Sequence, residues 1–75
     1  MIIETRIAQY AFAGMDADTE LLLKDVCKRF AKDMRFDFEW DYYAIYWTEE
    51  NWLLAKLAWP NIDTIVKAQD GKTQP

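Results

Sequence analysis

The sequence contains no histidine and no serine, and its only cysteine is Cys27. These absences exclude a Ser/His/Asp triad, a Cys/His dyad, a histidine-based metal site and a disulfide within the chain. The two glycines, Gly14 and Gly71, form no glycine-rich phosphate loop, and both are typical of positions where helices end. The composition therefore favours binding over catalysis.

Long apolar runs are missing as well. No uncharged apolar segment reaches the roughly 18 residues that a membrane-spanning helix needs. Glu4 and Arg6 interrupt the apolar residues near the N-terminus, which is unlike a secretory signal. A single cysteine is typical of a reducing compartment, where the thiol serves as a small apolar side chain. We therefore expect a soluble, cytoplasmic protein.

Apolar and aromatic residues, in contrast, are abundant. Of the 75 residues, 52% are hydrophobic and 16% are aromatic, which predicts a folded domain rather than a disordered chain. The length allows one domain, which we assign to residues 1–71, with a frayed tail at residues 72–75. Tryptophan and tyrosine rings are large for so small a core, so we expect some of them at the surface, where they mark interfaces.

Residues 2–13 allow two interpretations. The β-branched residues near the start favour a strand, whereas the spacing of apolar residues and the alanines suit a helix. We prefer a helix that ends at Gly14 in the left-handed conformation, and a strand is the alternative. Asp16 or Asp18 is expected to cap a second helix, which ends near Met34.

Residues 36–47 are predicted to form one strand, because apolar and acidic residues alternate in its first half. An isolated strand is not stable, so we expect residues 49–51 to form a hairpin turn and residues 52–59 to form a second strand. The alternative is a helix that begins after Thr48, with two acidic residues in its first turn.

After Pro60 we expect a short helix at residues 62–69, which ends at Gly71. These elements together predict an α+β domain, with two or three helices packed on an antiparallel β-hairpin or small sheet. If residues 2–13 form a strand, the order becomes β-α-β-β-α.

The net charge is −4, and residues 36–55 contain acidic residues but no lysine or arginine. Three of these acids alternate along the predicted strand, two lie at the predicted turn, and two tryptophans flank that turn. The candidate partner-binding residues are Asp37, Glu39, Asp41, Trp47, Glu49, Glu50 and Trp52. A row of like charges on a strand costs stability, so the pattern predicts a docking surface for a basic partner. A solvated face is the alternative interpretation.

Basic residues recur at steps of three and four in the second predicted helix. They are Lys24, Lys28, Lys32 and Arg35. Such a stripe is able to follow a nucleic-acid backbone, but an ordinary solvated helix face has the same spacing. The net negative charge of the chain opposes long-range attraction to phosphate.

The leading hypothesis is a small acidic protein-binding module, an inhibitor or accessory factor that docks on a larger intracellular protein. Nucleic-acid mimics that phages direct against host enzymes share its size and charge. The alternatives are a nucleic-acid-binding protein that uses the basic stripe and a structural homo-oligomer. We expect no enzyme, cofactor or metal site. The carboxylates are solvated, and those at Asp16, Asp18 and Glu20 lack the glycine and final glutamate of a calcium loop.

Overall fold

The computed structural model describes residues 1–69 and has an α+β architecture, as the sequence predicts. The elements in chain order are β1 (Ile2–Ala8), α1 (Gln9–Ala13), α2 (Ala17–Phe30), β2 (Asp33–Asp37), β3 (Tyr42–Thr48), α3 (Glu49–Ala58), α4 (Ile62–Ile65) and β4 (Lys67–Gln69). The predicted helix end at Gly71 and the predicted tail at residues 72–75 lie outside the described residues.

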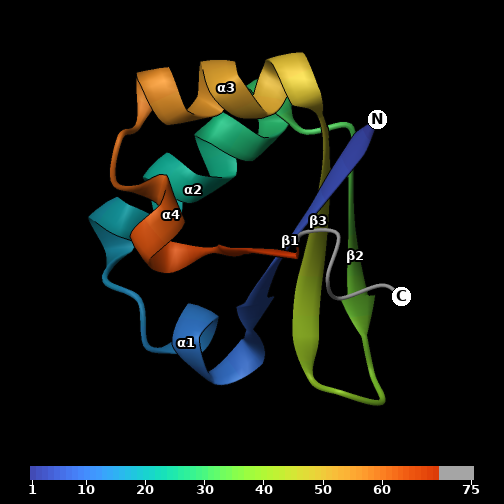
Figure 1. Cartoon of the computed structure of the whole chain (residues 1–75). Coiled ribbons are helices and arrows are strands. Elements are labelled where there is room, and N and C mark those ends of the chain that lie inside the picture. Colours follow the sequence, from blue (N-terminus) through green and yellow to red (C-terminus); the bar gives the residue numbers. More distant parts are fainter. Residues whose placement is uncertain (70–75) are drawn as a thin grey trace.

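The four strands form one antiparallel sheet in the order β2-β3-β1-β4. In this order β1 and β2 lie on either side of β3. The chain passes from β1 to β2 through α1 and α2. In the same way β3 and β4 lie on either side of β1, and α3 and α4 connect them. Two such split β-α-β units are the arrangement of ferredoxin-like domains. The helices lie on one side of the sheet, so one sheet face is covered by them (Figure 1).

The core lies between the covered face of the sheet and the helices. Burial alternates along the second half of β1 and from Ile45 to the end of β3, and α2 turns one apolar stripe toward these strands. The buried apolar core consists of Ile7, Leu23, Val26, Cys27, Ile45, Trp47, Trp52, Ala55, Trp59, Ile62 and Val66. The sheet and all the helices except α1 contribute to it, so the hairpin and the helices are held as one body.

A hydrogen-bond chain crosses this core. The indole N–H of Trp47 donates to Thr5 Oγ1 at 2.9 Å, and the Thr5 hydroxyl donates to the carbonyl oxygen of Ile45 at 3.3 Å. Thr5 and Trp47 are both fully buried, so each polar atom finds its partner inside the protein. The chain thereby fixes β1 against β3 through side chains as well as through the backbone ladder.

The N-terminal segment is a strand, so the preferred helix prediction was wrong and its alternative is confirmed. β1 is a central strand that pairs with both β3 and β4, and this pairing outweighs the local helix propensity. A helix remains only as the short α1. Gly14 follows it with φ −88°, so the predicted left-handed helix end is also wrong.

Residues 36–47 do not form one strand. β2 and β3 are two strands joined by a loop at residues 38–41, and α2 ends at Phe30 rather than near Met34. The predicted second strand at residues 52–59 is also wrong, because those residues lie in α3. β3 finds its neighbours in β1 and β2, so it needs no partner from that segment.

The alternative prediction for this segment, a helix capped by Thr48, is confirmed. Thr48 Oγ1 accepts the backbone N–H of Asn51 at 3.1 Å, and Glu49 and Glu50 occupy the first turn. The side chain of Asn51 donates to the carbonyl oxygen of Phe30 at 3.1 Å, which ties the start of α3 to the end of α2. The predicted helix at residues 62–69 is wrong in its second half, where β4 adds an edge strand to the sheet.

Candidate partner-binding hairpin tip

The loop between β2 and β3, residues 38–41, is fixed by hydrogen bonds, and we refer to Phe38, Glu39, Trp40 and Asp41 as the hairpin tip. One carboxylate oxygen of Asp37 accepts the backbone N–H of Glu39 at 2.9 Å and that of Trp40 at 3.0 Å. The N–H of Asp41 donates to the carbonyl oxygen of Asp37 at 2.9 Å. This is an Asx turn inside a short hairpin loop, and it holds the chain in one conformation.

Asp41 completes the loop with φ 55°, in the left-handed region that aspartate tolerates better than most residues. Its carbonyl oxygen accepts the N–H of Gln9 at 2.9 Å, so the loop is also tied to the start of α1. The position of the hairpin tip is therefore set both within the hairpin and by the neighbouring element.

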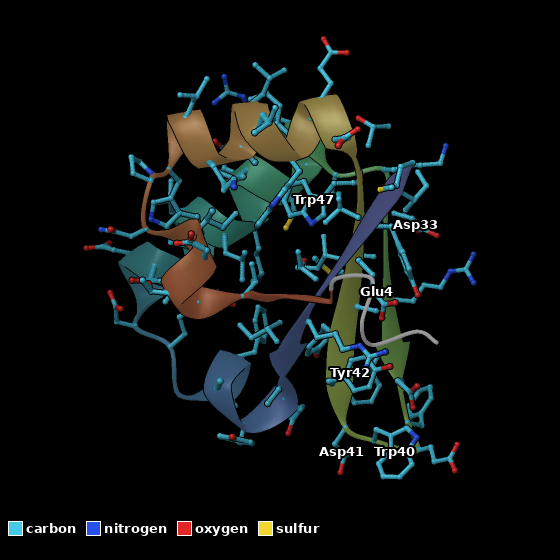
Figure 2. All side chains as sticks on the ribbon, in the orientation of Figure 1. Glu4, Asp33, Trp40, Asp41, Tyr42 and Trp47 are labelled. Carbon is cyan, nitrogen blue, oxygen red and sulfur yellow. The ribbon has the colours of Figure 1, made fainter. Side chains whose placement is uncertain are left out.

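Two large aromatic side chains project from this fixed loop. Phe38 is 85% exposed and Trp40 is 70% exposed. Phe38 meets the ring of Phe36 edge to face at 4.9 Å, and Phe36 lies 4.8 Å from the ring of Tyr43. Tyr43 packs against the core in turn, so aromatic contacts run from the core to the exposed rings. Figure 2 shows Trp40 and Asp41 at the far end of the hairpin from Asp33.

The predicted acidic row on one strand face is wrong. Asp37 ends β2 and accepts the hydrogen bonds of the turn, whereas Glu39 and Asp41 lie in the loop and are exposed. Glu49 and Glu50 are exposed at the start of α3, separated from the hairpin tip by the length of β3, about 20 Å. The five acids thus belong to two surfaces and do not form one row.

Trp47 and Trp52 contact each other, with ring centroids 5.1 Å apart, but they do so in the core. Trp47 is fully buried and Trp52 is 7% exposed, so neither ring is available to a partner. Within the hairpin, Phe38 and Trp40 are the largely exposed rings, and alternation in the sequence placed them on the apolar face of a predicted strand. Asp37 and Asp41 could have indicated the loop from the sequence, because aspartate is rare in strands and common in turns.

The face of the sheet without helices is occupied by contacts among its own side chains. Arg6 pairs with Glu4 at 2.8 Å and lies over the ring of Tyr42 at 4.5 Å. Arg35 pairs with Asp33 at 3.0 Å. The hydrogen bond from Arg35 lowers the pKa of Asp33, and the bond to Glu4 raises the pKa of Arg6. The charges on this face are thus arranged in pairs, beside a shallow hollow of about 300 Å³ that Ile2, Lys32, Asp33, Arg35 and Tyr46 line. Figure 2 labels Glu4, Asp33 and Tyr42 on this face.

The predicted basic stripe is divided between two surfaces. Arg35 lies on β2 and pairs with Asp33, so its place in the stripe is wrong. Lys24, Lys28 and Lys32 do lie together and line a hollow of about 370 Å³ at the end of α2 and the start of β2. Lys24 also pairs with Glu20 at 2.9 Å. Three lysines of the predicted stripe therefore share one surface, and Arg35 lies on another.

Apolar side chains line the same hollow. They are Cys27, Ala31 and Met34, and Asp33 lies beside them with its carboxylate engaged by Arg35 and by the N–H of Met34. Burial raises the pKa of the Cys27 thiol to about 12, so it is neutral near pH 7 and is a poor nucleophile. We refer to this region, with its three lysines and three apolar residues, as the basic hollow.

The carboxylates near the start of α2 act as helix caps. Asp16 accepts the hydroxyl of Thr19 at 2.6 Å and its backbone N–H at 3.4 Å, and these hydrogen bonds lower the pKa of Asp16. Within residues 1–69, no group of three or more histidine, cysteine, aspartate or glutamate residues is arranged to hold a metal ion. In the same range, no helix is long and apolar enough to cross a membrane.

Comparisons with protein-family models, with curated proteins and with solved structures find no match to this chain. The function therefore has to be inferred from the chemistry of its surfaces.

Proposed function

We propose that the chain is a small protein-binding module that docks through its hairpin tip on a larger protein, as an inhibitor or accessory factor. The observation that carries the proposal is the exposure of Phe38 and Trp40 on a loop held by hydrogen bonds. Tryptophan is enriched among the residues that contribute most to protein–protein affinity. Two such rings supply roughly 300–500 Å² of surface to bury, which is enough for the centre of an interface.

The loop also limits what binding costs. A flexible loop loses conformational freedom when it binds, and this loss reduces affinity. Here the carboxylate of Asp37 and the backbone bonds at Asp41 fix the loop before any partner arrives. Edge-to-face packing on Phe36 supports the ring of Phe38 in the same way. Such preorganisation distinguishes a built binding element from rings that are merely exposed.

The charges of the hairpin tip indicate what kind of surface the partner has. Glu39 and Asp41 flank the two rings and are exposed, so a complementary surface has an apolar pocket with a basic rim. The net charge of −4 adds long-range attraction to a basic protein. A reducing cytoplasm is the compartment that suits the single buried thiol of Cys27, and we infer that the module acts there.

The test is affinity capture from a lysate of the source cells, with nuclease present, using the wild-type chain and two alanine variants. Trp40→Ala removes a ring from the hairpin tip. The matched control is Tyr10→Ala, which removes an equally exposed ring, 81% accessible, from α1. We expect wild type and Tyr10→Ala to enrich the same protein and Trp40→Ala to lose it. Equal capture by all three chains contradicts the proposal.

A second variant tests the charges without disturbing the loop. Glu39→Lys reverses an exposed charge whose side chain makes none of the turn's hydrogen bonds. We expect slower association with the captured protein and a weaker dependence of that rate on salt. Asp37 is unsuitable for this purpose, because its carboxylate holds the loop. An unchanged association rate would show that the partner's surface is not basic.

A further inference from the structure

The chain carries two surfaces of opposite charge at opposite ends of β2. The basic hollow includes Asp33 and Met34, at the start of that strand, whereas the hairpin tip follows directly on its end at Asp37. Figure 2 shows Asp33 at one end of the hairpin and Trp40 at the other. A paired strand of five residues, about 14 Å from first to last, separates them and does not fold back. The hairpin tip of one molecule therefore cannot enter its own hollow.

The two surfaces match in size and polarity. The hollow, at about 370 Å³, lies at the lower end of the range of about 300–1,000 Å³ that is typical of ligand sites, where a side-chain-sized group fits. Its apolar side chains include Met34, which is partly exposed, and a methionine sulfur packs well against aromatic rings. Phe38 and Trp40, the two large exposed rings of the hairpin tip, are able to fill such a space.

The two surfaces also match in charge. Among residues 1–69, the ion pairs involve neither Lys28 nor Lys32, and they involve neither Glu39 nor Asp41. These four charged side chains are exposed, two at the basic hollow and two at the hairpin tip. If the hairpin tip of one molecule enters the hollow of another, two carboxylates meet two ammonium groups around an apolar centre. A lysine beside the ring of Trp40 adds a cation–π contact.

We propose that the basic hollow binds the hairpin tip of a second copy of this chain. The inference rests on the proposed function, because it names one partner of the same hairpin tip. The hairpin tip and the basic hollow are different surfaces of each molecule, so the contact is head to tail, and further copies add in a row or close a ring. A hairpin tip held in a neighbouring hollow is unavailable to a larger protein, so self-association and docking compete.

Sedimentation velocity tests the inference, with the protein at micromolar to millimolar concentration and at low and high salt. We expect the average mass of the wild type to rise with concentration and to fall when salt is added. Trp40→Ala, which impairs the hairpin tip, and the double variant Lys28→Glu/Lys32→Glu, which impairs the hollow, are each expected to stay monomeric. Circular dichroism checks that both variants are folded, as expected for exposed positions.

A mixture of these two variants gives the sharpest result. The Trp40→Ala chain keeps an intact hollow, and the double lysine variant keeps an intact hairpin tip. One productive contact is possible between them, so the equimolar mixture is expected to form dimers and nothing larger. Leu57→Ala is the control, because Leu57 is 77% exposed on α3, away from both surfaces. It is expected to associate like the wild type.

Four results would overturn the inference. They are a wild-type chain that stays monomeric throughout, association that persists in Trp40→Ala, a variant mixture that stays monomeric, and loss of association in Leu57→Ala. Binding of a labelled oligonucleotide that is lost in the double lysine variant would assign the hollow to nucleic acid instead. The proposed function is tested separately from this inference. The double lysine variant keeps its hairpin tip, so it is still expected to capture the larger protein even though it no longer self-associates.

Discussion

Trp47 and Trp40 belong to the same hairpin and have opposite surroundings. Trp47 is fully buried, donates its indole N–H to Thr5 and packs against Trp52. Trp40 is 70% exposed on a loop that is fixed by other residues. The ring of Trp47 therefore stabilises the core, whereas the ring of Trp40 lies largely in solvent and adds nothing to the core. If the hairpin tip binds a partner as we propose, stability and recognition lie at different ends of the hairpin, and substitutions should separate them.

The largest effect is expected at Trp47. Replacement by alanine removes a fully buried ring and leaves a cavity between the sheet and α3, which typically lowers the free energy of unfolding by about 3–5 kcal/mol. A domain of 75 residues has a total stability of about 4–11 kcal/mol, so the substitution is expected to remove between about a quarter of it and all of it. Urea denaturation followed by circular dichroism measures this change. A fully folded variant of unchanged stability would contradict the assignment of Trp47 to the core.

Thr5→Val is expected to have the next largest effect. Valine has nearly the shape of threonine but cannot accept the indole N–H of Trp47, which would be left buried and unpaired. A loss of about 1–3 kcal/mol is typical of such a group. Thr64→Val is the matched control, because Thr64 is exposed and its hydroxyl donates to a backbone carbonyl, that of Asn61. Equal stability of the two variants in urea would show that the buried hydrogen bond adds no more to the free energy of unfolding than the exposed one does.

Thr48→Ala is expected to have a smaller effect, because it removes the N-terminal cap of α3, the helix that packs against Trp47. The hydroxyl of Thr48 accepts the N–H of Asn51 and begins the helix that carries Trp52 into the core. Loss of such a cap costs about 1 kcal/mol, which lowers the melting temperature of a domain this small by about 4–8 °C. Thr48→Ser keeps the hydroxyl and is expected to melt close to the wild type. A melting temperature that falls equally in both variants would point to lost packing rather than to the cap.

Local patterns in the sequence predicted the α+β class, the helix after Asp16 and, as an alternative, the helix after Thr48. These features depend on capping residues and on apolar spacing that lie within a few positions of each other. The strand at residues 2–8 could not be decided in the same way, because its stability comes from pairing with β3 and β4, which lie more than 30 residues away.

The sequence identified the segment that contains the candidate site but did not predict its conformation. Residues 38–41 fall within the acidic, aromatic segment that the sequence singled out, yet the alternation of apolar and acidic residues predicted a strand with Phe38 and Trp40 on its apolar face. The loop follows from hydrogen bonds of Asp37 that a pattern of apolar and polar residues does not encode. The basic hollow forms where α2 ends at Phe30 and the chain turns into β2, whereas the sequence predicted a helix that continues to near Met34.

The smallest effect on stability is expected for Trp40→Ala, and this variant tests the comparison most directly. The ring is largely exposed and makes no contact with the core, so the free energy of unfolding should change by no more than about 0.5 kcal/mol. Urea denaturation beside Trp47→Ala measures the difference between the two tryptophans. If Trp40→Ala were strongly destabilising, the ring would serve the fold, and its exposure would no longer argue for a partner. A stable variant that has lost both capture and self-association would leave recognition as the one role that accounts for the ring.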